Sequence, residues 1–159
     1  MPHARRKLTA ALSIALGIAA PVGVLIAAAS ARDLQKARHD HYHELGDAFK
    51  TVRDETRAGS PDMAKIKAAA QVINEASIDQ GRWFPAGTGP EAGKTRALPE
   101  IWKRPEDFKA AQKVFSDAAP KLLAAANTSD LNAVKSTYGD LGKSCKNCHD
   151  TFRAPEDDH

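Results

Sequence analysis

The sequence is short of aromatic residues, cysteine and methionine. Only 6% of its 159 residues are Phe, Trp or Tyr, and it contains two cysteines and two methionines. Sparse aromatics together with abundant alanine favour closely packed helices over β-sheet, and no segment has the pattern of a convincing strand, an internal repeat or a low-complexity tract. The length suits one domain with a single sizeable core. We therefore predict an all-α fold.

The chain also lacks net charge once its first 31 residues are set aside. The formal charge of +3 comes from 23 Lys and Arg against 20 Asp and Glu, and residues 1–31 hold three of these bases, Arg5, Arg6 and Lys7, and no acid. The formally neutral remainder gives no sign of nucleic-acid binding. It also shows no nucleophile–base pair and no phosphate-binding loop, so we expect neither a nucleic-acid partner nor an enzyme.

The first 31 residues have the pattern of an export signal. A basic start is followed by an uncharged stretch, residues 8–31, which ends in a small-x-small cleavage site, Ala-Ser-Ala at residues 29–31. We predict a signal peptide at residues 1–31, a mature domain at residues 32–159 and a periplasmic location. The uncharged stretch is also long enough to span a bilayer, so a retained membrane anchor is the alternative.

Four segments of the remaining chain show the three- and four-residue spacing of apolar side chains that is typical of helices. The first spans about residues 33–57. In the second, Ser60 is expected as the N-cap and Pro61 as the first helical residue, and the helix ends near Gly81. A long loop follows as far as Arg104, and loops of this length are usually functional or packed down by their own side chains.

The third and fourth helices are expected in the last third of the chain. The third starts near Pro105, and Pro120 late in it should kink or break it. Residues 128–130 end the third helix and cap the fourth. Apolar side chains follow in steps of three and four along the fourth helix, and both cysteines, Cys145 and Cys148, fall on this stripe and so are expected to face the interior.

The two cysteines belong to the pattern C-x-x-C-H at residues 145–149, the attachment signature of a c-type haem. Cys145 and Cys148, three residues apart on a helical turn, can each form a thioether with a haem vinyl group. His149 then ligates the iron. We predict haem c, covalently attached at this motif.

Two other kinds of site use the same cysteine spacing. A redox disulfide of the thioredoxin type lies at the start of a helix that follows a strand, whereas this pair ends a helix in an all-helical chain. A zinc site needs two further ligands, which His39, His41 and His43 are numerous enough to supply. Zinc explains neither the position of His149 nor the apolar stripe. Haem explains the cysteines, the histidine, the interior position and the export together.

The chain resembles the class II cytochromes c, in particular the cytochrome c′ family. The resemblance covers about residues 38–153. It depends on Trp-Phe-Pro-Ala-Gly-Thr at residues 83–88, Ala-Leu-Pro-Glu-Ile-Trp at residues 97–102, Phe108, and the end of the chain at residues 145–153. It implies an up-down-up-down four-helix bundle, an architecture of which cytochrome c′ is a standard example. It also implies a homodimer through the first two helices.

The resemblance implies roles for residues outside the motif. Arg153 corresponds to an arginine near the proximal histidine, and Arg38 to an arginine near the haem propionates. His39 follows Arg38 at a position where the family commonly has glutamine. Tyr42 is at the position that faces the distal side of the iron. Low-spin relatives place a methionine ligand in this region, and this chain has none there.

Two functions are compatible with this resemblance, and the sixth ligand of the iron separates them. With Tyr42 beside an open position, a high-spin iron binds small gases such as nitric oxide and carbon monoxide. A strong sixth ligand gives a low-spin electron carrier. His41 is the candidate, because at about 100° per residue His41 and Tyr42 bracket the apolar stripe of the first helix about equally. We expect electron transfer, gas binding or both, with a redox protein or a gas as partner and a membrane only if residues 1–31 are uncleaved.

Overall fold

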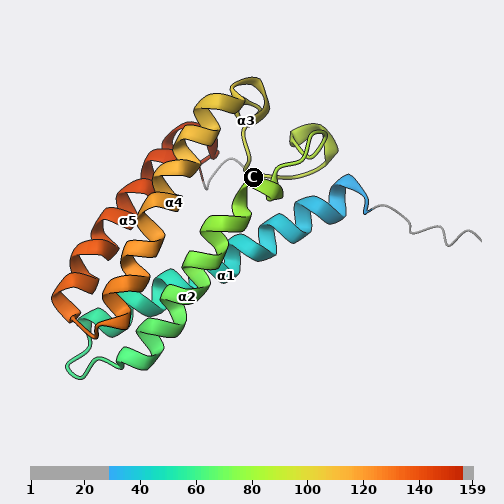
Figure 1. Cartoon of the computed structure of the whole chain (residues 1–159). Helices are drawn as coiled ribbons and strands as arrows, with labels where there is room; N and C mark the ends of the chain where they lie inside the picture. The colour runs from blue at the N-terminus through green and yellow to red at the C-terminus, as the bar shows by residue number, and fades with distance from the viewer. Residues whose placement is uncertain (1–28, 156–159) are drawn as a thin grey trace, which may run out of the picture.

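Four long helices form the bundle in the computed structural model, which describes residues 29–155. The predicted signal peptide lies outside the described residues except for residues 29–31. The helices run alternately up and down (Figure 1), which confirms the predicted fold. Among residues 29–155, none of the helices combines the length and the apolar character needed to cross a membrane. The four helices are α1 (Ala31–Arg57), α2 (Met63–Asp79), α4 (Pro105–Asn127) and α5 (Leu131–Phe152).

Helix α1 begins two residues before the predicted residue 33, because a capping box holds its first turn. Ser30 is the N-cap: its Oγ accepts a hydrogen bond from the Asp33 backbone N–H at 3.2 Å, and the Asp33 carboxylate accepts one from the Ser30 N–H at 3.1 Å. The box satisfies backbone donors that the first turn leaves without a helical partner. The cap therefore includes a residue that cleavage after Ala31 would remove.

Helix α2 begins later than the sequence predicts. Asp62 is its N-cap, and one oxygen of its carboxylate accepts hydrogen bonds from the backbone N–H groups of Ala64 and Lys65, at 2.9 and 3.1 Å. The prediction of Ser60 as N-cap and Pro61 as first residue is therefore wrong. An aspartate two residues further on accepts two of the unpaired backbone donors at once, and it therefore sets the start.

Helix α4 continues through Pro120, so of the two outcomes expected there the break does not occur, and the kink stays a prediction. A proline inside a helix removes one backbone hydrogen bond and costs about 3 kcal/mol. Ala119 and Leu122, on either side of it, are fully buried in the core, whereas Pro120 itself is exposed. Burial of the neighbouring side chains keeps this part of the helix packed in spite of the proline.

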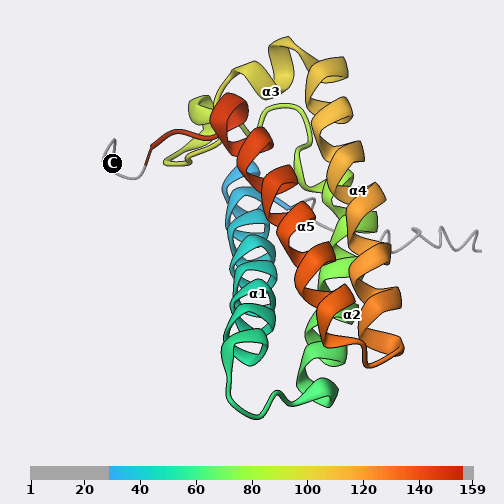
Figure 2. The same cartoon turned by 90° about the vertical axis from the view of Figure 1, so that its left-hand side faces the viewer.

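The interior consists of two clusters. The main core fills the space between the four long helices, with side chains such as Val52, Ile73, Leu122 and Leu141 completely inaccessible to solvent. A smaller cluster, called the end cluster here, consists of Ile101, Phe108 and Phe152 with the residues that pack around them. It lies at the end of the bundle where α2 and α5 end and α1 begins (Figure 2).

The segment from α2 to α4 covers this end of the bundle. It contains two short 3₁₀ helices, η1 (Gln80–Trp83) and η2 (Pro90–Ala92), and the short helix α3 (Glu100–Lys103). The indole N–H of Trp102 donates to the backbone carbonyls of Phe84 and Pro85, at 3.3 and 3.2 Å, and Phe84 packs against the end cluster. The segment is thus packed down by its own side chains, as the sequence predicts.

Candidate functional site

The two cysteines lie on the inner side of α5 as half-buried free thiols. Cys145 packs against the main core and Cys148 against the end cluster, so the predicted interior position is confirmed. Burial raises the pKa of both thiols. For Cys148 it rises to about 11, with a second contribution from Cys145. Both sulfurs are therefore neutral thiols near pH 7.

This setting suits two thioethers better than a zinc site. A thioether leaves its sulfur uncharged in apolar surroundings, whereas a zinc ligand is a thiolate. The high pKa of Cys148 disfavours the thiolate. Within the part of the chain that the structure describes, no three or more His, Cys, Asp or Glu side chains are arranged to hold a metal ion. The donor set at residues 145–149 fits haem c.

His149 follows the cysteine pair, one helical turn from Cys145. Although part of its side chain reaches solvent, desolvation of the ring lowers its pKa, and the positive charges of Arg153 and then Arg96 lower it further. An Arg153 guanidinium nitrogen lies 3.4 Å from Nδ1 of His149. A lowered pKa favours the neutral imidazole, which is the form that ligates a metal.

Arg96 is a site residue that the sequence does not reveal. The segment around it pairs with the end of α5: Leu98 N–H donates to the Phe152 carbonyl at 3.0 Å, and Ala154 N–H donates to the Arg96 carbonyl at 2.8 Å. The Arg96 guanidinium in turn donates to the Ala154 carbonyl at 2.9 and 3.0 Å. This pairing brings the positive charge of Arg96 close to His149, although the two residues are more than fifty positions apart in the sequence.

Arg38 is buried beneath the long connection, with only 5% of its surface exposed. Its guanidinium donates to the Thr88 hydroxyl at 3.0 Å, to the Thr88 carbonyl at 2.9 Å and to the Thr95 hydroxyl at 3.2 Å. It also lies over the rings of Phe84 and Trp102, 4.9 and 5.8 Å from their centroids. Arg38 therefore anchors the connection to α1. Its predicted role at the haem propionates stays a prediction.

Tyr42 turns inward from α1 towards the cysteines. Its ring meets Trp83 edge-on at 5.0 Å between centroids and lies 6.1 Å from Phe84. Desolvation of the phenol raises its pKa, and Cys148 and Cys145 contribute in the same direction. The phenol is thus neutral, and both cysteines lie near enough to affect its pKa.

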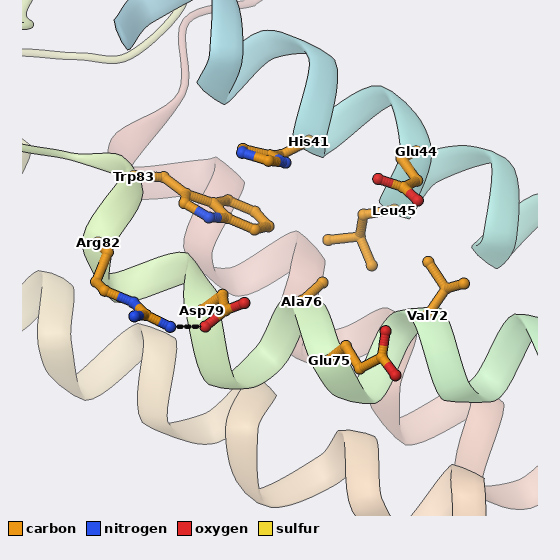
Figure 3. A pocket seen from close by; sticks show the side chains of 9 residues that line it. All are labelled: His41, Glu44, Leu45, Val72, Glu75, Ala76, Asp79, Arg82 and Trp83. Carbon is orange, nitrogen blue, oxygen red and sulfur yellow. Dashed lines mark hydrogen bonds and ion pairs between the residues drawn. The ribbon is translucent and has the colours of Figure 1, made fainter. Parts of the chain in front are cut away.

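His41 lies on the other side of Trp83. Its exposed ring stacks on the indole with centroids 4.8 Å apart and the ring planes 15° from parallel. Both rings line a groove of about 420 Å³ between α1 and α2, where Glu44 and Asp79 also lie (Figure 3). Neither cysteine lines this groove. The structure therefore separates two neighbours in sequence: Tyr42 faces the cysteines and His41 faces the groove.

His39 lies on the exposed face of α1. Its Nε2 is 3.1 Å from Nε2 of His43, and its Nδ1 is 3.5 Å from the Asp40 carboxylate. None of these contacts joins it to the cysteine pair. Its assignment as a cofactor-binding residue stays a prediction.

Comparison with known proteins identifies one family. The family model described as cytochrome C′ matches residues 33–153. A curated relative, cytochrome c′ of Allochromatium vinosum, is 33% identical over 149 residues, which are 92% of this chain and 95% of that protein. The solved nitric oxide complex of a mutant of cytochrome c prime from Alcaligenes xylosoxidans has a TM-score of 0.73 and 33% identity, over 82% of this chain and 100% of its own. A cytochrome c′ described as having ligand-controlled dimer dissociation has a TM-score of 0.76 and 30% identity, over 81% and 100%.

Proposed function

Because the chain belongs to the cytochrome c′ family, we propose that it is a periplasmic protein that binds small gases such as nitric oxide and carbon monoxide at a five-coordinate, high-spin haem iron. Members of this family carry covalently bound haem c. In this chain Cys145 and Cys148 would hold the haem and His149 would ligate its iron. The haem supplies an iron that changes oxidation state and takes a gas as a sixth ligand.

The position of Tyr42 is the observation that carries this proposal. It is an α1 side chain whose pKa both cysteines raise, and it presents a neutral phenol, a poor ligand for ferrous iron. Trp83 and Phe84 hold its ring in place. A bulky, weakly ligating group beside the motif leaves the sixth position open to a small diatomic gas. The solved nitric oxide complex of a relative supports the same function.

The alternative is a low-spin electron carrier with His41 as the sixth ligand. Its imidazole is exposed and stacked on Trp83 over the groove between α1 and α2, which neither cysteine lines. To reach the iron it would have to leave this stack and replace Tyr42. We therefore favour the open iron.

Substitution of Tyr42 tests this assignment. In Tyr42→Ala we expect the ferrous, haem-loaded protein to bind carbon monoxide about tenfold faster, because the smaller side chain crowds the gas less. A tenfold faster rate corresponds to an activation free energy that is lower by about 1.4 kcal/mol. Tyr42→Phe keeps the ring and is expected to stay close to the unaltered protein. Flash photolysis gives the rates. Sharp, split bands of six-coordinate haem in the ferrous protein, abolished in His41→Ala, would instead establish His41 as the ligand.

Electron transfer with a redox protein is the second function that this proposal includes. Its support is the apolar setting of Cys148, which packs against Ile101, Phe108 and Phe152. Such surroundings reorganise little when the charge of a bound group changes. We propose binding and electron transfer without a substrate reaction of the protein's own. A homodimer through α1 and α2 is also proposed, since a structural relative is described as a dimer that dissociates under ligand control.

Export is expected to leave a mature chain that begins at or near Arg32. The basic start, the uncharged stretch and the small residues before Arg32 support this. Cleavage there also removes Ser30, and losing such a cap costs a helix about 1 kcal/mol. Intact mass and N-terminal sequencing of the periplasmic fraction measure the cleavage site. A full-length chain recovered only with membranes would show an anchor instead.

A further inference from the structure

Two histidines converge on the exposed face of α1. His39 and His43 are four residues apart and therefore lie one above the other on the helix. Their Nε2 atoms are 3.1 Å apart and their ring centroids 4.3 Å apart. Both residues are exposed, so the two nitrogens are accessible from solvent. Neither histidine belongs to the proposed gas-binding site, which consists of Tyr42 and the motif at residues 145–149.

The spacing of the two nitrogens matches that of two ligands on one metal ion. Histidine nitrogens bind Zn²⁺ at about 2.0–2.1 Å, so two of them that subtend about 90–110° at the ion are about 2.9–3.4 Å apart. The observed distance of 3.1 Å lies within this interval. An i, i+4 histidine pair on one helical face is also the arrangement that helical zinc motifs use. The pair needs no backbone movement to chelate an ion.

Asp40 supplies the supporting carboxylate. One of its oxygens is 3.5 Å from Nδ1 of His39, and the other accepts a hydrogen bond from Lys36. A carboxylate beside Nδ1 favours the proton on that nitrogen and leaves the lone pair on Nε2. Metal-binding histidines commonly have such a partner on the ring nitrogen that does not bind the metal. The Nε2 of His39 is thus prepared to be a ligand.

Without a metal, one Nε2–H donates to the other Nε2. A hydrogen bond between two exposed side chains contributes little to stability, because water replaces either partner. It does keep the two nitrogens at the spacing that an ion requires.

We propose that His39 and His43 form a bidentate site for a divalent transition-metal ion such as Zn²⁺ or Cu²⁺, separate from the haem motif. No third His, Cys, Asp or Glu completes a cluster among residues 29–155, so water occupies the remaining positions of the ion. Imidazole nitrogens select Cu²⁺ and Zn²⁺ over the oxygen-seeking Mg²⁺. The site therefore selects transition-metal ions such as Cu²⁺ and Zn²⁺ over Mg²⁺, without selecting one of these transition metals.

Zinc titration of the haem-loaded, untagged mature protein tests the proposal. By calorimetry we expect one Zn²⁺ per chain at this site and no heat with Mg²⁺. His39→Ala and His43→Ala should each weaken zinc binding at least about tenfold, since even a supporting residue of a metal site is worth about that much. With Cu²⁺, electron paramagnetic resonance should show nitrogen ligands that are lost in the double variant.

His41→Ala is the matched control, because it removes an exposed histidine from the same helix but not from the pair. It should bind zinc as the unaltered protein does. Zinc affinity that is unchanged in His43→Ala, or reduced equally in all three single variants, would overturn the proposal, as would no zinc binding at all. The circular dichroism of each variant reports that α1 is intact. The visible spectrum of His43→Ala should not change, which separates this site from the haem.

Discussion

Replacement of both Cys145 and Cys148 by serine is expected to abolish covalent haem attachment completely. A thioether requires sulfur, and the chain has no other cysteine. The expected result is a protein whose intact mass equals that of the polypeptide alone and whose denatured form shows no haem stain on a gel. Each cysteine is only half-buried, so the loss of packing should cost about 1 kcal/mol per site and leave the bundle folded.

The controls for this experiment lie in the same motif. Asn147→Ser changes an exposed residue between the cysteines and should carry the full mass of one haem. Each single cysteine variant should keep one thioether. Haem that stays bound to the denatured double variant, or that acid and organic solvent extract from the unaltered protein, would contradict covalent attachment through these sulfurs.

His149→Ala is expected to remove the proximal ligand while leaving both thioethers chemically possible. Loss of a direct ligand should weaken iron binding at least as much as loss of a supporting residue, about tenfold or more. We therefore expect a low yield of mature protein and a shifted Soret band. The effect should be confined to the ligand, because His149 is an exposed residue and its loss removes little packing.

Added imidazole gives this experiment its control. An exogenous imidazole that enters the space left by the side chain should restore the Soret band of the unaltered protein. Arg153→Lys keeps the positive charge near His149 but not the planar guanidinium, and it should retain the ligand. A spectrum that does not change in His149→Ala would move the proximal ligand to another residue.

The helices could be predicted from the sequence, because each depends on local chemistry. Apolar spacing of three and four residues defines the faces of α1, α4 and α5, and their observed bounds agree with the prediction to within a few residues. The prediction was wrong at the start of α2, and of the two outcomes expected at Pro120, a kink or a break, the break does not occur. At the start of α2, a second backbone hydrogen bond to the Asp62 carboxylate set the first residue of the helix. At Pro120, burial of neighbouring side chains such as Ala119 kept α4 continuous.

The sequence by itself determined the all-α class and the C-x-x-C-H motif, because the haem-binding residues are contiguous and a single helical turn presents them. It could not decide which of Tyr42 and His41 faces the cysteines, because the two residues bracket the apolar stripe of one helix. That choice depends on Trp83, about forty residues away, which packs against both rings. Contacts between distant segments leave no trace in local periodicity. For the same reason only the tertiary structure brought Arg96 to His149 and set Arg38 under the long connection.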